Sequence, residues 1–275
     1  MVWFRRSVVC LSALVVAGCG GNPGATLPSP TAAGAPPRPA RQVRLIAFVG
    51  SAGKPPALEA KGAFERANPG LVIDMTFGGS GTLLQQMSLE QTGDIYMPGS
   101  DDYMDKAEAR KAVLPETRGI VAYLVPCICV RQGNPKGIRS LADLARPGLV
   151  VGLAEAGAVC LGDVSNEILR SAGLEQEVKK NVITYAKSCD QTQQLVQLGE
   201  VDAVIGWDAF ESWAPDKIDT VPIASKHLRV RSIPAAVSAY SKQREAARKF
   251  IGYLTSKEGK AIFAKHGYSV EPPTI

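Results

Sequence analysis

The sequence has little of what an enzyme active site needs. It contains two histidines in 275 residues, His227 and His266, and neither stands beside a motif at the end of a predicted strand. His227 is expected in a surface loop, and His266, just before Gly267, at the C-terminal cap of the last helix. A serine or cysteine nucleophile without a placed base is not activated. We therefore keep a serine or cysteine hydrolase only as a distant alternative.

Net charge is also small, and it gives no support for a nucleic-acid partner. The chain carries a net charge of +5, which falls to +3 once Arg5 and Arg6 leave with an N-terminal signal. Nucleic-acid binding usually requires a strongly basic face with aromatic residues among the basic ones. The sequence contains no motif of that kind.

The apolar run near the N-terminus is too short to span a bilayer as a resident helix. It follows Arg5 and Arg6 and ends in small residues, which is the pattern of a secretory signal. Val16-Ala17-Gly18-Cys19 is similar to the bacterial lipobox, in which the cysteine is lipidated and becomes the first mature residue. We predict a signal peptide at residues 1–18 and a periplasmic or cell-surface lipoprotein. An ordinary signal or an N-terminal anchor is the alternative.

Residues 19–41 contain little that could be buried, because after the cysteine they are mostly Gly, Pro, Ala, Ser and Thr. Such a stretch is predicted to be a disordered or polyproline linker. It would hold a folded body away from the membrane to which Cys19 is anchored. The remaining residues, 42–275, suffice for two small domains or one large one.

The folded body is organised around a glycine-rich stretch at residues 77–82. Apolar residues alternate over 71–77, and they recur at helical spacing over 83–87, so the segment predicts a strand, a turn and a helix. Free N–H groups at the helix start, with the Ser80 and Thr82 hydroxyls, favour an anion site. A capped tight turn is the alternative. The lysine of a Walker loop is missing, and Thr82 replaces the last glycine of a nucleophile elbow.

Predicted strands and helices alternate along the body, beginning with a strand at residues 42–50 and a helix at 55–67. This order favours an α/β protein with parallel strand pairing. Ligands of such proteins bind at the carboxyl ends of the strands. Ser51 and Ser80 each lie just beyond a predicted strand, so we expect both to face one cleft.

A second α/β unit follows the apolar stretch 121–130, which contains Pro126 and is long enough to leave one domain and enter another. The strands predicted in this unit end beside Cys160, Cys189 and Trp207. Equivalent strand ends of one sheet face the same crevice. The two cysteine sulfurs are therefore expected to lie near each other, across the cleft from the two serines.

The order of elements and four short segments resemble the periplasmic molybdate-binding proteins of ABC importers, which are type II substrate-binding proteins. The segments are Ser51, 77–83, 133–144 and 199–203, the last of which leads into the Trp207 strand. The resemblance covers about residues 43–270. It implies two lobes joined by a hinge, each a mainly parallel sheet flanked by helices. Lobe one would be residues 42–125 with 236–275, and lobe two residues 126–235.

The resemblance also implies a function. Members of this family are not enzymes and need no cofactor. They capture a tetrahedral oxyanion, molybdate or tungstate, between the lobes with neutral hydrogen-bond donors, and they deliver it to the importer permease. This chain is therefore expected to be a monomeric, lipid-anchored transport protein. By motif, Ser51 and Ser80 match the ligand-binding serines, Cys160 and Cys189 stand at or beside residues whose amides meet the oxyanion, and Trp207 replaces a tyrosine.

The two cleft cysteines depart from the family pattern, and two interpretations are open. As thiols they suit a soft metal ion or a thiophilic ligand, because thiolates favour such partners. As a Cys160–Cys189 disulfide they would brace two loops, which an exported location permits and which we expect. Cys127 and Cys129 stand at i and i+2 on a predicted strand, so they share one face, in the core or as partners of the other pair.

Overall fold

The computed structural model describes residues 42–274. The predicted signal peptide, the lipidated Cys19 and the linker up to residue 41 lie outside the described residues. No helix among residues 42–274 combines the length and the apolar character that a membrane span requires.

The first sheet has five strands in the order β2-β1-β3-β10-β4. They are β1 (Val43–Gly50), β2 (Leu71–Gly78), β3 (Ile95–Met97), β4 (Gly119–Leu124) and β10 (Arg231–Val237). β2 and β3 pair with β1 in parallel, whereas β10 is antiparallel to both β3 and β4. The sheet is therefore mixed, with the parallel strands on the side that carries the predicted serines.

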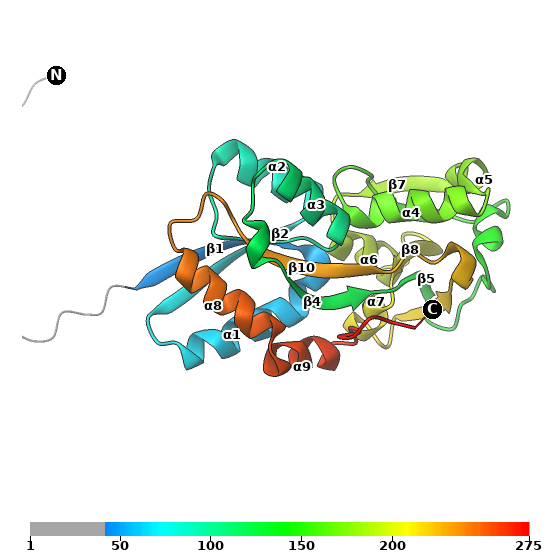
Figure 1. The fold of residues 1–275 in the computed structure, drawn as a ribbon. Coiled ribbons are helices and arrows are strands. Elements are labelled where there is room, and N and C mark those ends of the chain that lie inside the picture. Colours follow the sequence, from blue (N-terminus) through cyan, green and yellow to red (C-terminus); the bar gives the residue numbers. More distant parts are fainter. Residues whose placement is uncertain (1–41, 275) are drawn as a thin grey trace, which may run out of the picture. The chain divides into compact units, whose positions relative to one another are not determined.

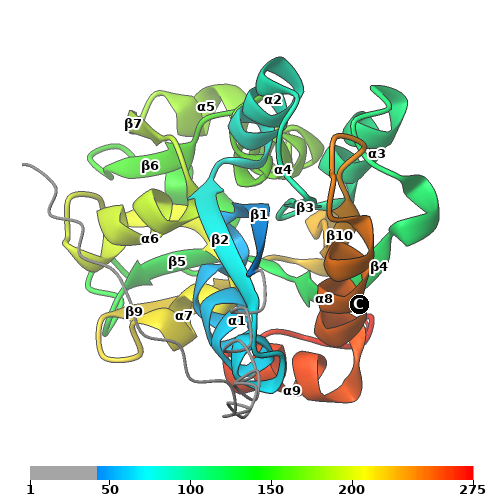
Figure 2. The ribbon, with the colours of Figure 1, turned by 90° about the vertical axis from the view of Figure 1, so that its left-hand side faces the viewer.

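Helices cover both faces of this sheet, as Figures 1 and 2 show. On one face lie α1 (Lys54–Ala67), α8 (Arg244–Thr255) and α9 (Lys257–Lys265); on the other lie α2 (Ser80–Glu90) and α3 (Asp101–Ala109). Alternation along β1 explains the two layers: Leu45 and Val49 belong to the core under α1, while Phe48 packs in the separate cluster under α2 and α3. The apolar side chains of α8, including Phe250 and Leu254, are buried.

The second sheet repeats this plan with five strands in the order β7-β6-β8-β5-β9. They are β5 (Pro126–Arg131), β6 (Val151–Ala154), β7 (Val182–Ala186), β8 (Ala203–Trp207) and β9 (Ile218–Pro222). Its helices are α4 (Cys160–Ser171), α5 (Glu175–Lys179), α6 (Cys189–Gln197) and α7 (Ala209–Trp213). β6 is parallel to β7 and β8, and β5 is antiparallel to β8 and β9.

Four single turns of 3-10 helix complete the secondary structure of the described residues. They are Ser51–Gly53, Pro115–Thr117, Leu141–Ala145 and Ser225–His227. Together with the helices and the two mixed sheets they form the two-lobed α/β fold that the sequence predicted. We expected mainly parallel sheets, but each sheet contains both parallel and antiparallel pairs of strands.

The chain crosses between the sheets at Val125 and again before Arg231. The long predicted strand 121–130 is two strands, β4 and β5, in two different sheets. Asp208 holds the first crossing through two hydrogen bonds to Val125. Its N–H donates to the Val125 carbonyl at 2.9 Å, and its Oδ1 accepts from the Val125 N–H at 3.3 Å. The return comes earlier than we expected. Residues 231–235, which we assigned to the second lobe, pair with β4 of the first sheet.

Candidate functional site

The two predicted serines stand at adjacent strand ends of the first sheet. β1 and β2 are parallel and in register to their last residues, Gly50 opposite Gly78. Ser51 follows β1 at once, and Ser80 is the first residue of α2. Each is only 1% exposed. Parallel pairing thus brings together two hydroxyls that are far apart in the sequence.

The second sheet brings its three predicted residues to the same place. Cys160 and Cys189 are the first residues of α4 and α6, which follow the parallel neighbours β6 and β7. Trp207 is the last residue of β8, on the other side of β6. All three side chains are buried. The cysteines therefore lie where free backbone N–H groups point out of a helix start.

Direct contacts join these residues into one buried group between the two sheets. The Cys189 N–H donates to Ser51 Oγ at 2.9 Å. A Cβ on Gly99 would lie 2.9 Å from Cys160 Sγ and 3.8 Å from Ser80 Oγ, so these two side chains meet beside Gly99. The side chains of Cys160 and Cys189 shift each other's pKa, and the Trp207 indole lowers that of Cys189. We call this group the junction cluster; its members are Ser51, Ser80, Cys160, Cys189 and Trp207.

The junction cluster is sealed by a backbone contact at the glycine turn. The Gly81 N–H donates to the carbonyl of Ala158 at 2.9 Å, across the boundary between the sheets. A Cβ on Gly79 would lie 2.4 Å from Ala158 O, and one on Gly81 would lie 2.1 Å from Gly157 O. The glycines are required here because the opposing backbone occupies the space of a side chain.

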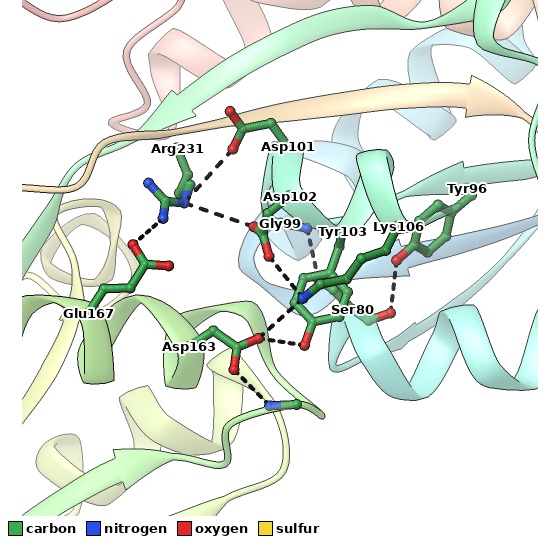
Figure 3. Close-up of polar contacts among 11 residues, drawn as sticks. Ser80, Tyr96, Gly99, Asp101, Asp102, Tyr103, Lys106, Asp163, Glu167 and Arg231 are labelled. Atoms are coloured by element: carbon green, nitrogen blue, oxygen red, sulfur yellow. Dashed lines mark hydrogen bonds and ion pairs between the residues drawn. The ribbon is translucent and has the colours of Figure 1, made fainter. Parts of the chain in front are cut away.

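Charged side chains beside the seal also connect α3 with α4, as Figure 3 shows. The Tyr103 hydroxyl donates to Asp163 Oδ2 at 2.7 Å, and Lys106 Nζ lies 3.6 Å from the same carboxylate. Arg231 donates to Glu167 of α4 at 2.6 Å. Burial raises the pKa of Tyr103, and its bond to Asp163 adds to the rise. The contact between the two halves of the body, one built on each sheet, is thus polar at its edge and tightly packed at the glycines.

The disulfide that we expected is not formed: all four cysteines of the described residues are free thiols. The neighbouring Cys189 thiol, a hydrogen-bond donor, lowers the pKa of the Cys160 thiol, and the Ser80 and Ser100 hydroxyls lower it further. The same contact and burial raise the pKa of Cys189. Cys160, at the start of α4, is therefore the thiol that ionises first.

The other two cysteines are core residues, as one of our alternatives had it. Cys127 and Cys129 share one face of β5, with their sulfurs 3.6 Å apart, and both are buried. Cys129 also lies 3.7 Å from the carbonyl of Trp207. Within residues 42–274, no group of three or more Cys, His, Asp or Glu side chains is arranged to hold a metal ion.

Sequence reasoning missed Ser100, which is fully buried beside the junction cluster. It precedes α3 in the N-cap position, yet its side chain makes no capping bond. Apart from its contact with the Cys160 sulfur, Ser100 Oγ has no hydrogen-bond partner among residues 42–274, and Trp207 Nε1 has none apart from its contact with the Cys189 sulfur. The order strand, glycine, serine, helix, which had marked Ser80, recurs at Gly99-Ser100 and was the available signal.

Comparison with known proteins gives a family match over most of residues 42–274. The profile of a family described as bacterial extracellular solute-binding protein matches residues 45–269. The molybdate-binding protein ModA of Mycobacterium tuberculosis is 29% identical over 275 residues, covering 98% of this chain and 99% of that protein. A sulfate-binding protein of Synechococcus elongatus is 22% identical over 298 residues, covering 97% and 83%.

A solved structure shows the same fold. The periplasmic molybdate-binding protein of Azotobacter vinelandii superposes with a TM-score of 0.72 at 15% identity, over 83% of this chain and all of that one.

Proposed function

Because the chain belongs to the bacterial extracellular solute-binding proteins, we propose that its junction cluster holds a tetrahedral oxyanion, molybdate or tungstate. The chain is a solute-binding protein of an ABC importer and not an enzyme. The choice of molybdate or tungstate draws on the ModA relative, and the sulfate-binding relative makes sulfate the main competitor.

The observation that carries this proposal is the pair of buried donors with weak partners, Ser100 Oγ and Trp207 Nε1. A buried donor without a good partner is costly, so two of them at one site point to a ligand that accepts hydrogen bonds. Ser51, Ser80 and the helix-start amides of α4 and α6 supply further neutral donors. Hydrogen bonds to a charged group contribute about 1.5–3 kcal/mol each, so several suffice without a lysine or arginine.

We further propose that the two sheets are two lobes which open and close about Val125 and the segment before Arg231. In this scheme lobe one is residues 42–125 with the C-terminal part from β10 onward, and the rest of the body is lobe two. The chain acts as a monomer, and the closed form presents the bound oxyanion to the permease.

Removing either serine hydroxyl is expected to weaken oxyanion binding about tenfold, because one hydrogen bond to the anion is lost. Ser51→Ala and Ser80→Ala should be titrated with molybdate, tungstate, sulfate and phosphate by calorimetry. Ser88→Ala is the matched control, since it lies on the same helix as Ser80 and its hydroxyl has no hydrogen-bond partner in the described residues. Unchanged affinity in both cluster variants would reject the site, and a preference for sulfate would correct the ligand.

We also propose that the protein is exported and anchored through a lipid on Cys19. The support is the charged, then apolar start that ends in Val16-Ala17-Gly18-Cys19. Cys19→Ala is expected to move the protein from the membrane fraction to the soluble fraction or to block maturation, whereas Cys10→Ala should not. Mass spectrometry of the native protein should show a modified N-terminal cysteine; an unmodified N-terminus at another residue would contradict the anchor.

A further inference from the structure

The junction cluster contains a chemical element that an oxyanion held by hydrogen bonds does not use: two facing thiols. Cys160 and Cys189 begin α4 and α6, which follow the parallel neighbours β6 and β7, and both are buried free thiols. Both approach the first half of the body: the Cys189 N–H donates to Ser51 Oγ at 2.9 Å, and Cys160 Sγ would lie 2.9 Å from a Cβ on Gly99. A pair of thiols in that position can bond to a ligand as well as surround it.

Within residues 42–274, the groups beside the two sulfurs are hydroxyls and an indole N–H, and no set of three or more Cys, His, Asp or Glu side chains is arranged to hold a metal ion. The Ser80 and Ser100 hydroxyls lie against the Cys160 sulfur, and the Trp207 indole lies against that of Cys189. Sulfur bonds to soft central atoms, whereas hydroxyl and indole donors bind oxygen. The combination fits one ligand that presents both: an oxyacid whose central atom is thiophilic.

We propose that the junction cluster also takes a trivalent thiophilic oxyacid of the arsenous acid type, bonded to Cys160 and Cys189. This inference rests on the proposed oxyanion site, because it uses the same residues and the same hydroxyl donors. It narrows the soft-ligand interpretation of the two cysteines to a neutral oxyacid.

The chemistry balances without an oxidant or reductant. Each cysteine sulfur displaces one hydroxyl group from the trivalent centre: an S–As bond forms, an As–O bond breaks, and the thiol proton leaves with the hydroxyl as water. Two condensations release two waters, and the centre keeps one hydroxyl group. That hydroxyl would exchange hydrogen bonds with Ser80 and Ser100, the hydroxyls beside Cys160.

Charge favours this ligand over a dianion when Cys160 is ionised. The hydrogen bonds that lower the Cys160 pKa also make its sulfur the better nucleophile of the pair at a given pH. A thiolate in the cluster would repel molybdate, which carries two negative charges, but it would not repel arsenous acid, which is neutral near pH 7. The sulfur pair thus adds a ligand class to the site.

The test uses the mature protein, kept reduced with a phosphine, and arsenite as the probe. Native mass spectrometry and calorimetry should find one arsenic per chain with the loss of two waters. Cys160→Ser and Cys189→Ser should each lose at least about a hundredfold in arsenite affinity, because the gain from holding the ligand at two points disappears. Cys127→Ala with Cys129→Ala is the matched control: it removes the other thiol pair and should leave arsenite binding unchanged.

Molybdate titration of the wild-type protein separates the two proposals. If molybdate binds and arsenite does not, the thiol inference fails and the oxyanion site stands. If arsenite still binds to both single cluster variants, or is lost only in the Cys127 and Cys129 control, the assignment to Cys160 and Cys189 is wrong. If neither probe binds, the oxyanion site itself fails.

Discussion

Gly81→Ala is expected to weaken oxyanion binding about a hundredfold or more while both halves of the protein stay folded. The new Cβ would lie 2.1 Å from the carbonyl oxygen of Gly157 and 3.0 Å from the Tyr103 ring. The Gly157 oxygen is a backbone atom, so it cannot move aside as a flexible side chain would. If the substitution raises the free energy of the closed state by about 3 kcal/mol, a ligand that binds only to that state loses roughly a hundredfold in apparent affinity.

Gly81→Ala should disfavour the closed state without destabilising the fold, because Gly81 is in α2 and alanine is a better helix former than glycine. Gly252→Ala is the matched control because it is also in a helix, α8, and a Cβ there meets nothing within 4 Å. Calorimetry measures the affinity, and small-angle scattering with and without ligand reports closure. Wild-type affinity in Gly81→Ala would mean that the closed contact is not needed for binding.

Asp208→Asn is expected to stabilise the protein above pH 6 by as much as about 3 kcal/mol. Burial raises the pKa of the Asp208 carboxyl from its ordinary value of 3.8 to about 6. The folded protein therefore binds this proton more tightly than the unfolded chain does. The favourable contribution of Asp208 to the free energy of unfolding is therefore fully present below pH 3.8. It decreases as the pH rises and is lost above about pH 6. A difference of about two pKa units corresponds to roughly 3 kcal/mol.

Asparagine removes the buried charge and keeps an oxygen that can accept from the Val125 and Ala209 N–H groups. Melting temperatures of both proteins should be compared between pH 4 and pH 8, where the gain should grow with pH. Asp216→Asn, at an exposed position, should show little change at any pH. A gain that is equal across this range, or a loss at pH 8, would show that the Asp208 charge does not oppose folding.

The serines could be predicted from the sequence because the information is local. A strand-like run of residues that ends in glycine and serine marks the end of a strand, and the ends of two parallel neighbouring strands meet at one edge of the sheet. The register of β1 with β2, Gly50 opposite Gly78, is the result. The same logic places Cys160, Cys189 and Trp207 together in the second sheet.

What the sequence could not predict depends on partners far along the chain. Arg231 pairs with Leu124, and nothing near residue 231 indicates to which sheet that strand returns. The antiparallel strand β9 and the short helices α5 and α7 were likewise not predicted. Ser100 follows β3, which has only three residues and therefore too little alternation to mark its end. The state of Cys160 and Cys189 depends on the positions of two loops, which spacing alone does not define.

The seal at Gly81 and Ala158 has a consequence for the rate at which cargo leaves. Ser51 and Ser80 are each 1% exposed, so a ligand between them has no path to water while the halves are in contact. In the proposed opening and closing, dissociation waits until the halves separate, and the opening rate then sets an upper limit on the exchange rate of every ligand, however weakly it is held. A permease that pulls the halves apart would therefore control the timing of delivery without competing for the cargo.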